Sequence, residues 1–226
     1  MQNFWNKMKL IWTDGTLRKR VLFVFFALII FRLLAAIPIP GIDTVQLNRF
    51  LSNNQFFGIL NIFSGGGLSN LSVIMLGVGP YITGSIIMQL LTIMVPSLKK
   101  IYHEEGEAGR KKFAQYGRLL TVPLAAIQGF SLLYVLEKQN ILTNLTRFNY
   151  VTDLFIVIAG SVLLMWIGEL VSEFGIGNGV SLIIFAGIVS RLPSWVSQHI
   201  FTFDVSQVPL YLVFVVVGAL ILAGIV

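Results

Sequence analysis

The chain has 226 residues, of which 56% are hydrophobic and 12% charged, and its mean hydropathy is +0.83. A soluble domain needs more charge to cover its surface, so this composition excludes an ordinary soluble fold and favours an integral membrane protein. The absence of cysteine excludes disulfides, thiolate metal sites and cysteine nucleophiles, and the net charge of +6 is typical of basic residues flanking membrane spans.

Six apolar stretches predict an all-α fold, a polytopic bundle of transmembrane helices within one unit, residues 1–226. About 20 helical residues cross a hydrocarbon core about 30 Å thick. The fourth and fifth stretches are short, and we expect them to span with Glu169 and Glu173 at the interface. The predicted spans cover about residues 21–37, 71–95, 119–136, 154–170, 174–190 and 205–226.

The first stretch is too long for a signal peptide and is followed by Pro38 and Pro40 rather than by a cleavage site, so we expect it to be retained. Arg32 interrupts this stretch near its outer end. Outward snorkelling of the side chain explains Arg32 more simply than a functional ion pair.

Lysine and arginine predict the orientation, because cytoplasmic loops are enriched in them. Eleven of the 16 basic residues lie before the first span or between the second and third, which places the N-terminus in the cytoplasm. These are Lys7, Lys9, Arg18, Lys19, Arg20, Lys99, Lys100, Arg110, Lys111, Lys112 and Arg118. The opposite side carries Arg49, Lys138, Arg147 and Arg191.

An outer segment, about residues 56–70, joins a short apolar helix at 56–63 to three consecutive glycines, Gly65 to Gly67. A short apolar helix with a flexible tail is expected to fold back onto the protein. A re-entrant or interfacial helix that simply packs is the plainer interpretation.

Two pairs of branched apolar residues recur at helical spacing. Ile82 and Ile86 share one face of the second span, and Val180 and Ile184 share one face of the fifth. Simple core packing explains both pairs. The functional alternative is a ring that closes a water-filled pore by dewetting.

The sequence favours no enzyme. His103 and His199 lie in different loops without further ligands at metal-binding spacing. The glycine-rich run 175–179 follows no strand and lacks the lysine of a phosphate loop. We therefore predict no catalytic residue, no metal and no cofactor.

Four motifs in order resemble the SecY family, the channel subunits of bacterial protein translocons. They are RLLAAIPIPGID at 32–43, NIFSGGGLSNLSVIMLGVGPYITGSIIMQLL at 61–91, GEAGRKKFAQYGR at 106–118 and MWIGELVSEFGIGNGVSLIIFAGIVSRLP at 165–193. The resemblance covers essentially the whole chain. It implies the N-terminal half of the SecY inverted-repeat fold plus the next helix.

The resemblance also implies site residues. The pore ring would include Ile82, Ile86, Val180 and Ile184. The plug would be Asn61, Ile62, Phe63, Ser64, Gly65, Gly66, Gly67, Leu68, Ser69 and Asn70. The lateral gate would include Ser85, Gln89, Leu90 and Thr92, and cytoplasmic partners would contact Lys99, Lys100, Arg110, Lys111 and Lys112.

The implied function is passage of unfolded secretory proteins across, and of membrane proteins laterally into, the bacterial inner membrane. Implied partners are SecE, SecG, the SecA ATPase, the ribosome, signal peptides, nascent chains and lipids, with no nucleic-acid recognition beyond ribosome docking. SecY-type proteins have ten spans, so we expect a piece of a longer chain. The alternatives are half of a secondary transporter, or a truncated SecY chain carried on a ribosome as an insertion substrate.

Overall fold

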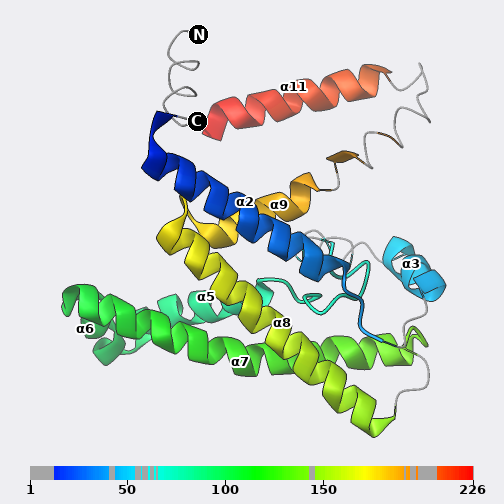
Figure 1. The fold of residues 1–226 in the computed structure, drawn as a ribbon, viewed down its shortest axis with the longest axis horizontal. Coiled ribbons are helices and arrows are strands. Elements are labelled where there is room, and N and C mark those ends of the chain that lie inside the picture. The colour runs from blue at the N-terminus through cyan, green and yellow to red at the C-terminus, as the bar shows by residue number, and fades with distance from the viewer. Residues whose placement is uncertain are drawn as a thin grey trace. The chain divides into compact units, whose positions relative to one another are not determined.

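The computed structural model describes residues 13–40, 44–53, 57, 61, 64, 66–142, 146–190, 192–193, 197 and 208–225. All regular elements in these ranges are α-helices, and two segments pair through a single antiparallel bridge between Pro38 and Ser72. The helices are α2 (Gly15–Ala36), α3 (Thr44–Asn53), α5 (Gly79–Met94), α6 (Pro96–His103), α7 (Gly106–Lys138), α8 (Arg147–Phe174), α9 (Gly179–Val189) and α11 (Val208–Ile225) (Figure 1).

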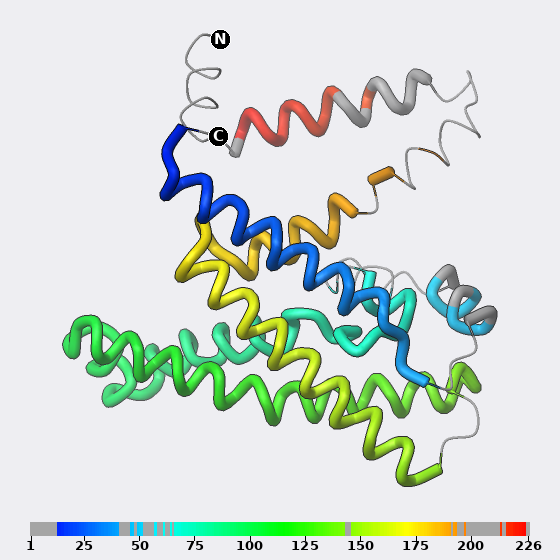
Figure 2. Tube along the Cα trace, in the orientation of Figure 1, coloured from blue at the N-terminus to red at the C-terminus, as the bar shows by residue number. Residues whose placement is uncertain are grey.

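Two compact units make up the chain: residues 1–189 and residues 190–226. The second unit contains α11, an apolar helix of 18 residues. In the first unit, α7 packs against α5, α6 and α8, and α8 packs against α2 and α9. Figure 2 traces this path: α2 runs alongside α8, and α5 runs alongside α7.

Asp14 caps the start of α2: its carboxylate accepts hydrogen bonds from the backbone N–H of Thr16 (2.9 Å) and from the Thr16 hydroxyl (2.6 Å). Such a cap satisfies one of the unpaired amides at the start of a helix. Both hydrogen bonds favour the charged carboxylate and lower the pKa of Asp14 below its ordinary value.

Two helices of the described part, α7 and α8, are long and apolar enough to cross a membrane, judged by length and composition. The pair α5–α6 counts as a third if it is one span, although its axis bends by 109°. Pro96 explains the bend, because proline forces the preceding residue, Val95, into extended backbone (φ −115°, ψ 106°). The prediction of six spans stays a prediction.

The helix boundaries differ from two predicted spans. The span predicted at 71–95 is helical only from Gly79, and residues 66–78 form turns and the bridge to Pro38. The span predicted at 174–190 is helical from Gly179, since a turn at 175–178 separates it from α8. In contrast, the predictions 21–37, 119–136 and 154–170 fall within, or end one residue beyond, α2, α7 and α8.

The turn segment 66–78 lies between the two cores of the first unit. Leu68, Leu71 and Met75 join a core formed with α3, the C-terminal half of α7 and the first half of α8. Ile74 and Val78 join the second core, formed with α2, α8 and α9. All five side chains are at most 2% exposed, so the turn segment is anchored by its apolar side chains in both cores.

Candidate functional site

All four predicted ring residues line one groove. Ile82 and Ile86 come from α5, and Val180 and Ile184 come from α9. The groove is open on one side and has a volume of about 760 Å³. The sequence places each pair on one helix face, and the fold brings the two faces together.

Close packing of α8 against α9 positions the second pair. Gly168 of α8 faces α9, and a Cβ at this position would stand 3.0 Å from Cγ2 of Val180. The turn before α9 is fixed by Ser172, whose hydroxyl donates to the Gly168 carbonyl (2.9 Å) and accepts from the Gly179 N–H (2.8 Å). Asn178 caps α9, because its side-chain oxygen accepts from the Ser181 N–H (3.1 Å).

The other helix of the groove, α5, is held against α7 by small residues. A Cβ at Gly84 would stand 3.3 Å from the Gly117 carbonyl oxygen and 3.6 Å from the Thr121 hydroxyl. Thr121 itself donates to the Gly117 carbonyl (2.9 Å), so its hydroxyl is satisfied within α7. Small residues at such a contact let two helices approach closely, which fixes where Ile82 and Ile86 stand.

A polar wall lines the same groove beside the apolar ring residues. Arg118 of α7 donates from Nε to Oε1 of Glu169 on α8 (2.7 Å). The Arg118 side chain is 46% exposed and that of Glu169 is 21% exposed, so solvent screens the pair and its contribution to stability is about 0.2–1 kcal/mol. The other polar or charged lining residues are Tyr81, Ser85, Gln89, Lys111, Ser172, Glu173, Asn178 and Ser181.

The sequence did not reveal this ion pair. The sequence places Arg118 among the cytoplasmic charges and Glu169 at the interface, but no sequence pattern joins the two residues. The available signal was that opposite charges occupy the same-side ends of consecutive predicted spans. In an antiparallel pair of helices such ends lie close together.

The predicted gate residues divide between two environments. Ser85 and Gln89 line the groove. Leu90 is 56% exposed and lies outside the groove lining, and the Thr92 hydroxyl donates back to the Gln89 carbonyl (2.6 Å). Their role in a lateral gate stays a prediction.

The predicted plug is described only in part, since Ile62, Phe63 and Gly65 lie outside the described residues. Asn61 is 4% exposed, and its side-chain oxygen accepts from the Ser69 N–H (2.9 Å). Ser64 donates to the Asn61 carbonyl (3.1 Å) and accepts from the Leu68 N–H (3.1 Å). These bonds tie the segment into a closed loop.

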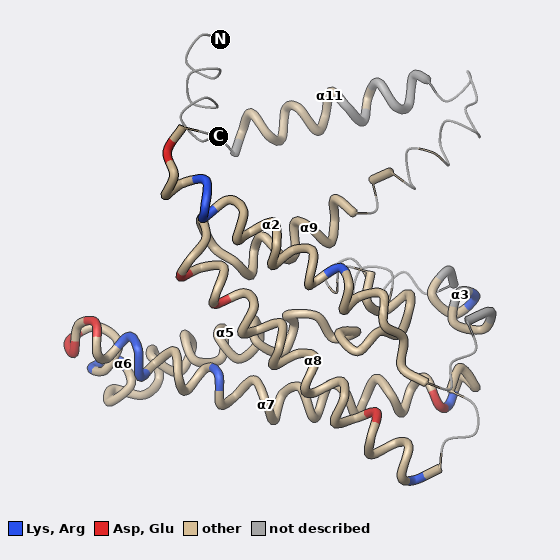
Figure 3. Tube along the Cα trace, in the orientation of Figure 1, with Lys and Arg blue, Asp and Glu red and all other residues tan. Residues whose placement is uncertain are grey.

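The predicted cytoplasmic contact residues all lie on the hairpin formed by α6 and the start of α7. Lys99 and Lys100 belong to α6, and Arg110, Lys111 and Lys112 belong to α7. All five are exposed, and Figure 3 shows acidic and basic residues gathered at this end of the two helices. Two exposed ion pairs, Lys111–Glu107 (3.1 Å) and Lys112–Glu105 (3.6 Å), stabilise the hairpin only slightly.

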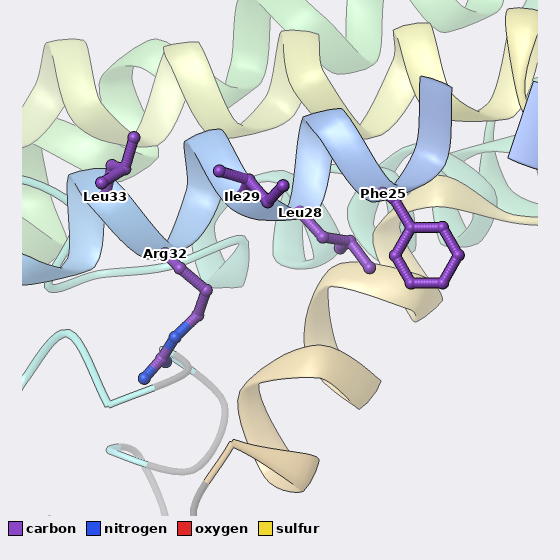
Figure 4. A pocket seen from close by; sticks show the side chains of 5 residues that line it. All are labelled: Phe25, Leu28, Ile29, Arg32 and Leu33. Atoms are coloured by element: carbon purple, nitrogen blue, oxygen red, sulfur yellow. The ribbon is translucent and has the colours of Figure 1, made fainter. Parts of the chain in front are cut away.

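Arg32 lies on the exposed side of α2. It stands at one end of an apolar groove of about 290 Å³ lined by Phe25, Leu28, Ile29 and Leu33 (Figure 4). Its side chain points away from the helix axis in Figure 4, as a snorkelling arginine would. The groove of the ring residues does not include Arg32.

Comparison with known proteins gives one consistent result. A family model described as SecY matches residues 72–226. The protein translocase subunit SecY of Buchnera aphidicola subsp. Schizaphis graminum is 45% identical over 198 residues, which are 85% of this chain and 44% of that protein. SecY of Escherichia coli K12 is 44% identical over 82% of this chain and 43% of its own length, and SecY of Thermotoga maritima is 41% identical over 86% and 47%.

Solved structures agree on the fold. A protein-conducting channel and Sec61 of the canine ribosome–channel complex from the endoplasmic reticulum each match with a TM-score of 0.55 and 22% identity. Each match covers 79% of this chain and 37% of the solved chain. This chain therefore spans somewhat less than half the length of the curated relatives it matches.

Proposed function

The chain belongs to the SecY family, and on that premise we propose that it forms part of the wall of a protein-conducting channel in a bacterial membrane. Unfolded secretory proteins would pass through this channel, and membrane proteins would leave it sideways into lipid. The observation that carries the proposal is that Ile82, Ile86, Val180 and Ile184, from two helices far apart in sequence, line one groove.

A ring of branched apolar side chains suits such a channel. It must pass chains of every sequence, so its narrowest part should offer no hydrogen bonds or charges that retain a particular chain. An apolar constriction also blocks ions in the resting state, because water leaves a narrow hydrophobic passage and ions cannot cross without it. The polar wall with Arg118 and Glu169 would then face the wider, water-filled part.

The test is to replace Ile82 with asparagine in the complete channel and to measure resting ion conductance in planar bilayers. We expect conductance to rise by about tenfold, equivalent to a barrier lower by about 1.4 kcal/mol, because a polar side chain keeps water in the constriction. Ile93→Asn is the matched control, since Ile93 lies on the same helix, is 81% exposed and does not line the groove. Equal conductance of the Ile82→Asn variant and the wild type would refute the ring assignment.

The finer roles follow from the same family membership. We propose that residues 61–70 act as the plug, and that Ser85, Gln89, Leu90 and Thr92 contribute to the lateral gate. The exposed basic residues of the α6–α7 hairpin would contact the ribosome or the SecA ATPase, which supplies the energy that this channel subunit does not. SecE and SecG would complete the channel complex.

Membership of the SecY family also favours the channel over a secondary transporter. A transporter would hold a small substrate at the middle of the membrane. Here the ring residues at the groove are apolar. Its charged residues, Lys111, Arg118, Glu169 and Glu173, lie in the halves of α7 and α8 that we assign to the cytoplasmic side. We propose the bacterial inner membrane as the location, with the N-terminus in the cytoplasm.

A further inference from the structure

A third cleft, away from the ring residues, lies between the C-terminal end of α7 and the N-terminal end of α8. Its volume is about 420 Å³. Three aromatic rings and two opposite charges line it together with one valine: Phe130, Tyr134, Glu137, Arg147, Tyr150 and Val151. The proposed channel function does not use this cleft.

The walls of the cleft are held in place by contacts between the two helices. The Tyr150 hydroxyl donates to the Phe130 carbonyl (3.1 Å), and the two rings meet edge to face with centroids 5.8 Å apart. The Phe130 and Tyr134 rings are nearly parallel, 11° between their planes, with centroids 6.5 Å apart. The cleft is therefore a built feature of the α7–α8 pair.

Both helices place the cleft at headgroup depth. Glu137 directly follows the predicted span 119–136, and Val151 lies just before the predicted span 154–170. Helix α7, with 33 residues, is about 50 Å long and exceeds the hydrocarbon core of about 30 Å, so its end reaches the headgroup layer. A lipid headgroup is thus the most abundant molecule that the cleft meets.

The two charged residues that line the cleft, Glu137 and Arg147, favour one class of lipid headgroup over others. Glu137 and Arg147 come from different helices, and no ion pair between them occurs in the described part of the chain. A carboxylate would repel a purely anionic headgroup, whereas a zwitterionic headgroup matches both walls. Its phosphate suits the guanidinium of Arg147, and its ammonium suits the carboxylate of Glu137.

The aromatic rings add attraction for an ammonium group. The Lys138 ammonium takes one face of the Tyr134 ring, 5.4 Å from its centroid, so the Phe130 and Tyr150 rings are left for a headgroup ammonium. A cation–π contact with these rings strengthens when water is excluded. A primary ammonium can in addition donate hydrogen bonds to Glu137, which a quaternary ammonium cannot do.

We propose that the cleft between α7 and α8 binds the headgroup of a zwitterionic phospholipid of the phosphatidylethanolamine type. Arg147 holds the phosphate, Glu137 holds the ammonium, and Phe130 and Tyr134 contact the headgroup and the first part of the lipid. The inference requires only that α7 and α8 cross a bilayer, so it stands or falls independently of the ring assignment.

The test uses the complete protein, freed of lipid and titrated with phosphatidylethanolamine or phosphatidylglycerol of identical acyl chains, with bound lipid counted by native mass spectrometry. We expect one site that prefers phosphatidylethanolamine. Arg147→Gln should weaken its binding about fivefold, as expected for loss of one partly exposed charged contact. The matched control Arg110→Gln, at the other end of α7, should bind as the wild type does.

A charge reversal gives the sharper result. Glu137→Arg leaves two basic walls, so the site should now prefer phosphatidylglycerol; a misfolded variant would not gain a preference. Unchanged preference in Glu137→Arg, or no preference in the wild type, would overturn the proposal. It would also be overturned if Phe130→Cys, labelled with a thiol-reactive photo-crosslinker, became joined to another polypeptide in most molecules in native membranes, since a protein helix would then occupy the cleft.

Discussion

At some contacts in this fold, the carbonyl group of one segment occupies the space of a missing side chain. Gly160 of α8 faces the Val73 carbonyl, and Gly179 of α9 faces the Gly168 carbonyl. A Cβ at either glycine would collide with that carbonyl oxygen. These residues therefore fix how closely α8 approaches the turn segment 66–78 on one side and α9 on the other.

We expect Gly160→Ala to destabilise the protein by about 1–3 kcal/mol, because backbone must move to admit the methyl group. Gly117→Ala is the matched control: it is also a buried helical glycine, but nothing stands within 4 Å of the added Cβ. That variant should be neutral or gain up to about 1 kcal/mol from helix propensity. The melting temperatures of both variants, measured by thermal unfolding in detergent, test this prediction. Equal melting temperatures would contradict the predicted clash.

The short helix α9 depends on the turn that precedes it. Eleven residues are too few to form a stable helix alone, so its order comes from packing against α8 and from its cap. Gly177 adopts a positive φ of 73°, and Asn178 then caps the first turn. Because α9 carries Val180 and Ile184, the turn also sets where half of the ring residues stand.

Removal of this cap should loosen the start of α9. Asn178→Ala should cost about 1 kcal/mol and speed hydrogen exchange in its first turn by about fivefold, since the Ser181 N–H loses its partner. Asn178→Asp keeps an oxygen at the same place and should exchange as the wild type does. Hydrogen exchange measured by mass spectrometry on peptides covering α9 compares the wild type with the two variants. Identical rates in all three proteins would exclude a capping role of Asn178.

Sequence alone predicted the long helices well, because hydropathy over 18 to 20 residues measures what a bilayer selects. The prediction is wrong at the start of α5, where the uncharged run from Leu71 indicates a helix. Leu71 instead has a positive φ of 40°, and the Ile39 N–H donates to its carbonyl (2.9 Å). Such long-range pairing leaves no trace in local hydropathy.

The candidate site was predictable to a similar degree. Periodicity placed Ile82 with Ile86 and Val180 with Ile184, since residues four apart share a helix face. Their meeting in one groove depends on the packing of α5 against α7 and of α9 against α8, which single-helix periodicity does not contain. The Arg118–Glu169 pair was missed for the same reason.

In the first unit, large apolar side chains are exposed on the surface as well as buried in the two cores. Ile93, Met94 and Phe148 are 81%, 77% and 76% exposed, as expected of surfaces that face lipid or further protein. The chain has no cysteine, so single cysteines can report the orientation of this unit without background.

We expect Arg110→Cys to react with a membrane-impermeant maleimide only when the cytoplasmic side is accessible, and Glu137→Cys only from the opposite side. Both positions are exposed and lie near opposite ends of α7, about 40 Å apart by helical rise. Labelling of intact and inverted vesicles distinguishes the two faces. Reversed labelling would invert the proposed topology, and labelling of both from one side would show that α7 does not cross the membrane.

The turn segment 66–78 has a consequence for how the protein is made. Its N–H groups donate within the segment and to the chain that follows α2, as the Val73 N–H does to the Ile37 carbonyl (3.1 Å), whereas α8 meets the segment through Gly160 and apolar side chains. Backbone that pairs locally needs no hydrogen-bond partner from a helix that is made later. We therefore expect residues 66–78 to fold against the end of α2 soon after their synthesis, and α8 to close over a segment that already has its shape.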